Sequence, residues 1–455
     1  MFSLYSTEKL QAFINSSRDN LSSITSAIQL DNNITLTSAM SASPKLQVET
    51  HFRNYGTETS IGSDAPVADN EKQEPVVEVP PRDIPIIVLG PVIGGGFGES
   101  KVGWRWAFYI NLFIGAVCAP AWLFLLPSKD PRPGVPYKQR AAETDYVGTV
   151  LLMGGLTSFI LAINWAGVTY PWDSGRIIGL FVTSGVLFIL LGIQQVWTIF
   201  TTVARRIIPV QFFRSKIVLI LFSVTAASGA SAFIPIYFVP LFFQFTRSDG
   251  ALQAGVRLLP LIVVMVVTIL ANGALMAKLG YYMPWYLVGG LFTVAGSALM
   301  YTVDQDTSES RIYGYTVLVG IGVGMFLQAS FSVAQAVVKA EDIPPAVGFI
   351  TLAQFLGITM ALAIGNSVFL NLSEEGISKI LPNMSASEIQ GAIEGAAGGL
   401  LERLTPEVKH QVLGAITDAI GETYVLVIAA GSLIALLSLL MKKERLFASS
   451  GVSAA

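Results

Sequence analysis

Long apolar runs separated by short polar breaks constrain this chain more than any other feature. A helix needs about 20 mostly apolar residues to cross the hydrocarbon core of a bilayer. Runs that approach or exceed this length occupy residues 84–98, 106–126, 146–167, 177–199, 217–243, 253–276, 283–302, 312–336, 346–371 and 422–441. The pattern predicts an all-α polytopic membrane protein with about ten transmembrane helices, the first of them short for a full crossing.

The composition supports lipid as the solvent for most of the chain. Charged residues make up only 13% of it, whereas a soluble domain carries about 25%. The net charge of −3 gives no indication of a nucleic-acid partner. Cys118 is the single cysteine, and His51 and His410 are the only histidines, so zinc chemistry and His-based catalysis lack their side chains. We expect no metal, no cofactor, no catalytic residues and no enzymatic activity.

Basic residues predict the orientation, because cytoplasmic loops of membrane proteins carry an excess of Lys and Arg. They concentrate in the segments 127–145, 200–216 and 442–455, which fall on one side if every run crosses once. Both termini are then cytoplasmic, and we expect a multi-pass protein of the plasma membrane. Residues 1–83 are polar throughout and predict a disordered cytoplasmic tail.

The same topology predicts a long extracellular loop over residues 372–421. Two glycosylation sequons begin at Asn371 and Asn383, at its start and within it. Both are glycosylation candidates, because the lumenal machinery has access to this side.

Uncharged polar side chains interrupt several apolar runs. Gln328 and Gln335 lie two helical turns apart, with Ser332 between them, and Gln354 and Asn366 lie in the next run. An amide in hydrocarbon is costly unless it is paired or faces water. Two explanations stay open: hydrogen bonds between helices, worth about 1 kcal/mol each, or the wall of a substrate cavity, for which these four amides are the candidates.

Two further features have simple explanations. Arg257 follows a polar break by only a turn or two, and snorkelling of its side chain to the membrane interface is the favoured explanation. The glycines at 320, 322 and 324 lie within an apolar run and not at a strand-to-helix turn. They indicate close packing of helices and not a nucleotide site.

Several stretches resemble the fourteen-helix drug:proton antiporters of the major facilitator superfamily, in particular fungal toxin efflux pumps. The most specific is Leu89-Gly90-Pro91-Val92-Ile93-Gly94-Gly95-Gly96-Phe97, followed by residues 104–112. It is similar to the antiporter motif of that family, and the resemblance assigns Gly90, Pro91, Gly94 and Gly95 to it. Residues 164–172, with Asn164-Trp165-Ala166-Gly167, and residues 249–260 resemble further helices of the family. In the family the motif helix packs closely and seals the transport cavity on one side.

The resemblance also implies a domain organisation with an incomplete N-terminal lobe. In the family, four helices precede the motif helix, whereas here the polar tail leads directly into it. The implied parts are a two-helix remnant of the N-terminal lobe (84–126), two linker helices with flanking cytoplasmic loops (127–216), a six-helix C-terminal lobe (217–441) and the cytoplasmic tail (442–455).

Two functions are compatible with these residues. The first is proton-coupled efflux of small amphipathic organic compounds, such as a drug, a toxin or a secondary metabolite, with substrate, protons and the lipid bilayer as partners. The second is a truncated, transport-inactive membrane remnant that acts only through protein interaction. The sequence indicates neither the substrate nor the oligomeric state.

Overall fold

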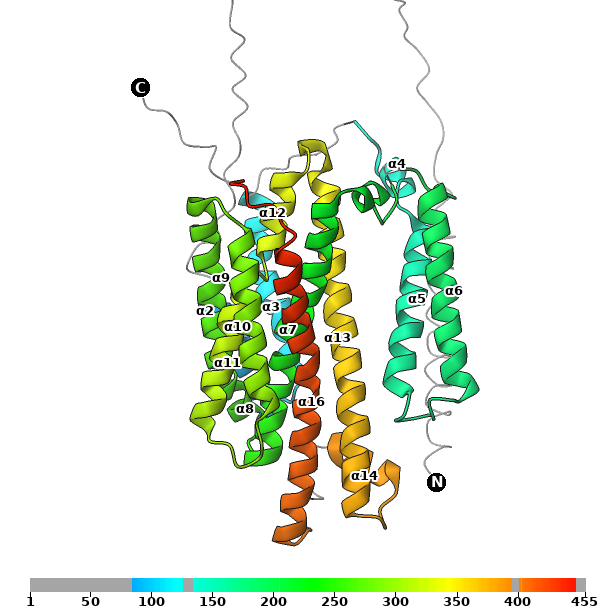
Figure 1. Cartoon of the computed structure of the whole chain (residues 1–455). Helices are drawn as coiled ribbons and strands as arrows, with labels where there is room; N and C mark the ends of the chain where they lie inside the picture. Colours follow the sequence, from blue (N-terminus) through cyan, green and yellow to red (C-terminus); the bar gives the residue numbers. More distant parts are fainter. Residues whose placement is uncertain (1–83, 126–133, 204, 395–400, 402, 447–455) are drawn as a thin grey trace, which may run out of the picture. The chain divides into compact units, whose positions relative to one another are not determined.

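The computed structural model describes residues 84–125, 134–203, 205–394, 401 and 403–446 (Figure 1). Within these residues, nine helices are long and apolar enough to cross a membrane, which confirms the prediction of an all-α polytopic membrane protein. The first of the ten predicted spans, residues 84–98, forms α2 (Ile84–Glu99), a helix of only 16 residues that is not among these nine. The predicted disordered tail, 1–83, lies outside the described residues.

The helices follow one another with short connections. The N-terminal part holds α2, α3 (Trp106–Pro120) with a π-helical extension (Ala121–Leu125), α4 (Tyr137–Ala142), α5 (Tyr146–Trp165) and α6 (Gly175–Trp197). The C-terminal part holds α7 (Lys216–Arg247), α8 (Ala251–Arg257), α9 (Leu259–Leu279), α10 (Met283–Tyr301), α11 (Glu309–Gly324), α12 (Ala329–Val337), α13 (Ile343–Ile380), α14 (Ala386–Glu394) and α16 (Pro406–Ser438). Prolines begin α9, α10, α13 and α16, where a missing backbone N–H costs nothing.

The core lies among the C-terminal helices, where α10 packs on α11 and α16, and α7 packs on α13 and α16. Glycines bring these helices into backbone contact. A Cβ at Gly320 would lie 2.9 Å from the carbonyl oxygen of Leu261 on α9, and one at Gly322 would lie 2.6 Å from that of Gly289 on α10. The predicted close packing around these glycines is confirmed.

The α5–α6 hairpin is held together by a buried carboxylate at the start of α5. Asp145 accepts hydrogen bonds from the backbone N–H of Gly148 at 2.8 Å and from the side-chain amides of Gln194 at 3.0 Å and Gln195 at 2.7 Å. Gln195 also accepts from the backbone N–H of Ile208 at 2.8 Å. One buried acceptor group therefore caps α5 and fixes the far end of α6 beside it.

The span of α3 is the most exposed of the nine candidate membrane spans of the described chain. None of its described residues is buried, and the long apolar side chains of Phe108, Leu112 and Val117 are more than half exposed. It contacts the rest of the described chain mainly through α2. Apart from its contact with α2, the surface of this candidate span is therefore open to lipid or to a partner.

The segment 372–421, predicted as a long extracellular loop, is largely helical in its described residues. The helix α13 continues to Ile380, α14 follows at 386–394, and α16 begins at Pro406. Polar residues do not end α13, because its buried face continues through Ser373 and Ile377 while the polar side chains lie on the opposite face. An amphipathic extension of this kind needs one covered face and no hydrocarbon.

The two glycosylation candidates differ in how accessible their side chains are. The side-chain nitrogen of Asn371, the atom that would carry a glycan, donates to the carbonyl oxygen of Ser367 at 2.8 Å and to that of Ala166 at 3.3 Å. The sequon residue Ser373 is fully buried. Asn383, in contrast, is exposed in the turn between α13 and α14.

We expect Asn383→Gln to abolish an endoglycosidase-sensitive mobility shift of the full chain in a fungal host, and the control Asn371→Gln to retain it. The reason is access, because only Asn383 presents its amide to the glycosylation machinery. A shift that survives in Asn383→Gln would contradict this assignment. A wild-type chain without any shift would contradict the predicted outer location of this segment.

Candidate functional site

The motif helix α2 packs against α8 through reciprocal glycine contacts. A Cβ at Gly95 would lie 2.8 Å from the carbonyl carbon of Ala251, and one at Gly255 would lie 2.7 Å from the carbonyl oxygen of Pro91. Real Cβ atoms do not approach backbone this closely, so both positions require glycine at this separation of the helices. Pro91 and Gly95, two residues of the predicted motif, therefore form the contact.

A polar contact lies beside the glycine contact. The Oε1 atom of Glu99, at the end of α2, accepts a hydrogen bond from the backbone N–H of Leu252 at 2.9 Å. This N–H belongs to the first turn of α8, where backbone donors have no partner inside the helix. The two helices are therefore held together at two levels, once by backbone contact and once by a charge-assisted hydrogen bond.

The other two motif glycines are placed differently. Neither Gly90 nor Gly94 has a described residue within 4 Å of the position that a Cβ would take. Of the four predicted motif residues, the structure thus brings Pro91 and Gly95 to the α2–α8 contact and leaves Gly90 and Gly94 facing open space. A face of two glycines one turn apart is suited to close helix packing.

The other side of α8 is tied to α7 and α11 by charges. The guanidinium of Arg257 pairs with Asp249 and, at 2.5 Å, with Glu309, and it hydrogen-bonds the Tyr313 hydroxyl at 3.1 Å. It also lies 4.6 Å from the ring centre of Phe243. The hydrogen bond to Glu309 raises the pKa of Arg257 against the opposite effect of burial.

Snorkelling is therefore the wrong explanation for Arg257. The side chain is only 12% exposed and Asp249 only 10%, whereas Glu309 is 43% exposed, so the charge is paired with carboxylates of the protein and reaches solvent only in part. The spacing from Asp249 to Arg257 was visible in the sequence, but Glu309 and Tyr313 lie more than 50 residues away. Only the packing of α11 on α7 and α9 could place them here.

The four predicted cavity amides do not form one group. Gln328 and Gln335, with Ser332, are exposed along α12 and its start, and Gln354 is half-buried on α13. Asn366 donates to the side-chain oxygen of Asn164 on α5 at 3.4 Å. Hydrogen bonding between helices thus accounts for Asn366. That Gln328 and Gln335 line a substrate cavity stays a prediction.

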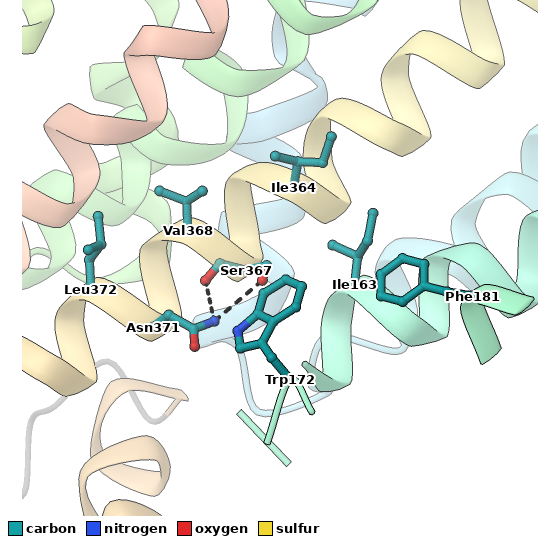
Figure 2. Close-up of a pocket in the computed structure, with 8 residues that line it drawn as sticks. All are labelled: Ile163, Trp172, Phe181, Ile364, Ser367, Val368, Asn371 and Leu372. Atoms are coloured by element: carbon teal, nitrogen blue, oxygen red, sulfur yellow. Dashed lines mark hydrogen bonds between the residues drawn. The ribbon is translucent and has the colours of Figure 1, made fainter. Parts of the chain in front are cut away.

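A cavity of about 500 Å³ lies between the α5–α6 hairpin and α13 (Figure 2). Ile163, Trp172 and Phe181 form the hairpin side, and the α13 side runs from Ile364 to Leu372 and includes Ser367 and Asn371. None of the four predicted cavity amides lines it. Sequence reasoning missed this cavity because it singled out amides inside spans, and Asn371 was interpreted as a glycan acceptor.

The Arg257 pairing generates a stability prediction. Removing one partner of a charge-assisted pair that is largely shielded from solvent costs about 1–3 kcal/mol, because Asp249, only 10% exposed, loses its partner. We expect Arg257→Gln to lower the thermal midpoint of the purified chain clearly. Lys339→Gln, which breaks an exposed pair with Glu341 at 3.8 Å, is the matched control and should leave the midpoint unchanged. Equal midpoints for Arg257→Gln and wild type would overturn the paired-charge interpretation.

Comparison with known proteins identifies the family of the chain. A family model described as Major Facilitator Superfamily matches residues 86–362. The chain is 53% identical over 363 residues to the MFS-type transporter pgmG of Aspergillus terreus, and the match covers 80% of this chain and 65% of that protein. It is 44% identical to the efflux pump alnA of Emericella nidulans, with 81% and 67% covered. It is also 44% identical to the phomenoic acid biosynthesis cluster MFS-type transporter of Leptosphaeria maculans, with 81% and 61% covered.

A solved bacterial homolog of the human lysosomal transporter Spinster, in an inward-facing and occupied conformation, aligns with a TM-score of 0.41 and 15% identity, over 80% of this chain and 83% of that one. The chain spans just under two thirds of the length of the pgmG transporter and of the phomenoic acid cluster transporter. The family prediction from the residues around Gly90 and Pro91 is confirmed. This chain is a multi-pass membrane protein that belongs to the Major Facilitator Superfamily.

Proposed function

We propose that this chain is a proton-coupled exporter of small amphipathic organic compounds in the plasma membrane, with both termini cytoplasmic. The observation that carries the proposal is the glycine contact between α2 and α8, which involves Gly95 and Gly255. It joins the helix that the family resemblance assigns to the N-terminal lobe with a helix of the C-terminal lobe.

Transport by alternating access requires two bundles that rock against each other about a central site. A contact made by backbone and glycine is suited to such a boundary, because it excludes water when closed and leaves no interlocked side chains to disengage. The Glu99 hydrogen bond to Leu252 adds a polar contact that water can replace on opening. The α2–α8 boundary is therefore our candidate for the seal on one side of the cavity.

The names of the relatives support the cargo class. One relative is an efflux pump and another is the transporter of a phomenoic acid biosynthesis cluster, both from fungi. We propose a fungal secondary metabolite as the exported compound and a proton gradient as the driving force.

Proteoliposomes that contain the purified full chain test this proposal. They are given an acidic lumen and an organic extract of fungal culture medium, and the accumulated metabolites are identified by mass spectrometry. We expect uptake of at least one amphipathic compound that stops when a protonophore collapses the gradient. Uptake equal to that of protein-free liposomes would refute export by this chain.

A second candidate function, the transport-inactive remnant, is favoured by the bare surfaces of α2 and α3. Gly90 and Gly94 face open space, and no described residue of α3 is buried. Both are expected if helices that normally cover them are missing between the tail and α2. Sequencing the transcript across Asp83 and Ile84 tests this, and a read that inserts further apolar spans there would remove the basis for the remnant.

The seal generates a prediction with a control from the same helix. Gly95→Ala and Gly255→Ala place a Cβ against backbone atoms that cannot move cheaply, so we expect the α2–α8 boundary to open and gradient-driven uptake to fall several-fold. Gly96→Ala adds the same methyl group where the nearest atom, Cδ1 of Leu252, would be in ordinary contact at 3.8 Å, and it should keep wild-type uptake. Equal uptake in all three variants would exclude a sealing role for this contact.

A further inference from the structure

The segment 164–172, which the family resemblance singled out, has no part in the α2–α8 contact, and the structure gives it another use. We propose that the cavity between the α5–α6 hairpin and α13 is a binding site for an uncharged, drug-sized amphipathic molecule. The inference rests on the proposed function only for the identity of that molecule as cargo.

Three hydrogen bonds, which we call the polar seam, hold the α5–α6 hairpin against α13 and α14 beside the cavity. Asn366 donates to Asn164, and Asn371 donates to the carbonyl oxygen of Ala166 at 3.3 Å. Gln390 of α14 donates to the carbonyl oxygen of Val168 at 2.9 Å. Hydrogen bonds between amides and backbone are favourable where water is absent. They tie the hairpin to α13 and α14 beside the cavity.

Gly167 makes the turn that closes this seam. Its φ is +78°, a conformation that favours glycine. A Cβ there would also lie 2.7 Å from the indole nitrogen of Trp172 and 2.7 Å from Cγ of Asn371. The glycine thus lets an indole N–H and an amide meet at one end of the cavity, as Figure 2 shows for Trp172 and Asn371.

The lining is typical of a small-molecule site. Binding cavities of about 300–1,000 Å³ combine apolar and aromatic walls with a few polar groups, and this one measures about 500 Å³. Phe181 and Ile163 face α13 from the hairpin, whereas Ser367 and Asn371 supply the polar atoms on α13. Trp172 is 53% exposed, so its side of the cavity is not closed to a ligand.

The lining also selects against charge. None of the eight lining residues has an ionisable side chain, so a cationic ligand would lose its hydration without gaining a counter-charge. An uncharged molecule with fused or flat rings can pack against Trp172 and Phe181 and hydrogen-bond at the Asn371 end. Most of the lining belongs to candidate membrane spans, so such a molecule can arrive through the bilayer.

Equilibrium binding to the full chain in lipid nanodiscs tests the proposal with two radiolabelled probes of similar size. Progesterone is uncharged and tetraphenylphosphonium is a cation, and protein-free nanodiscs give the background of each. We expect saturable progesterone binding and no saturable phosphonium binding. Saturable binding of the cation alone, or of neither probe, would overturn the proposal.

Variants locate the binding. Val368→Trp fills the cavity and should weaken progesterone binding by about tenfold or more, whereas Val425→Trp, on an exposed position of α16, is the size-matched control and should not. Leu372→Asp adds a negative charge at the lining, and we expect it to create saturable phosphonium binding while progesterone binding weakens. Loss of progesterone binding in Val425→Trp to the same extent would place the probe elsewhere.

The binding experiment and the transport experiment test the two proposals independently. Progesterone binding that Val368→Trp abolishes, without any gradient-driven uptake in proteoliposomes, supports the site and refutes export. Uptake without saturable progesterone binding supports export and overturns the site.

Discussion

The fold depends on places where two helix backbones touch without side chains between them. Lipid tails are as apolar as leucine, so helices in a bilayer gain little from hiding leucine from lipid and depend on close-range packing. In this chain such contacts recur as glycine pairs. Gly289 faces Gly322 between α10 and α11, and Gly290 faces Gly431 between α10 and α16. The contact of Gly95 with α8 is the same kind of contact, at the place where the motif helix α2 meets the C-terminal part.

Charged side chains with partners inside the protein lie at the ends of helices. Arg257 and Asp249 lie at the limits of α8 and Asp145 caps α5, and each has its partners within the protein. As a result α8 is held on one side by backbone contact with α2 and on the other by an ion-pair cluster on α11. A separation of α2 from α8, as the proposed seal requires, would leave the charged contacts of Arg257 intact.

The spans, the family and the glycine packing could be predicted from the sequence, because each depends on local pattern. The full lengths of α13 and α16 could not be predicted from the sequence. The residues around Ser373 are polar, and only the helices packed against them reveal that one face of α13 is buried. Arg257 was misinterpreted for the same reason, since its partner Glu309 is distant in sequence. Asn371 matched a sequon, and the fact that its amide is used inside the fold is a property of the α5–α13 contact.

The buried core and the proposed seal lie in different parts of this chain. The buried core belongs to α7 and the helices after it, and the hairpin is tied to that core by Asn366, Asn371 and Gln390. The helix α3 adds no buried residue. A chain in which α3 had no partner would therefore keep its core and its hairpin cavity, and it would lose only what requires a second moving bundle. A stable, ligand-binding protein is accordingly no proof of a working exporter, and the two properties have to be measured apart.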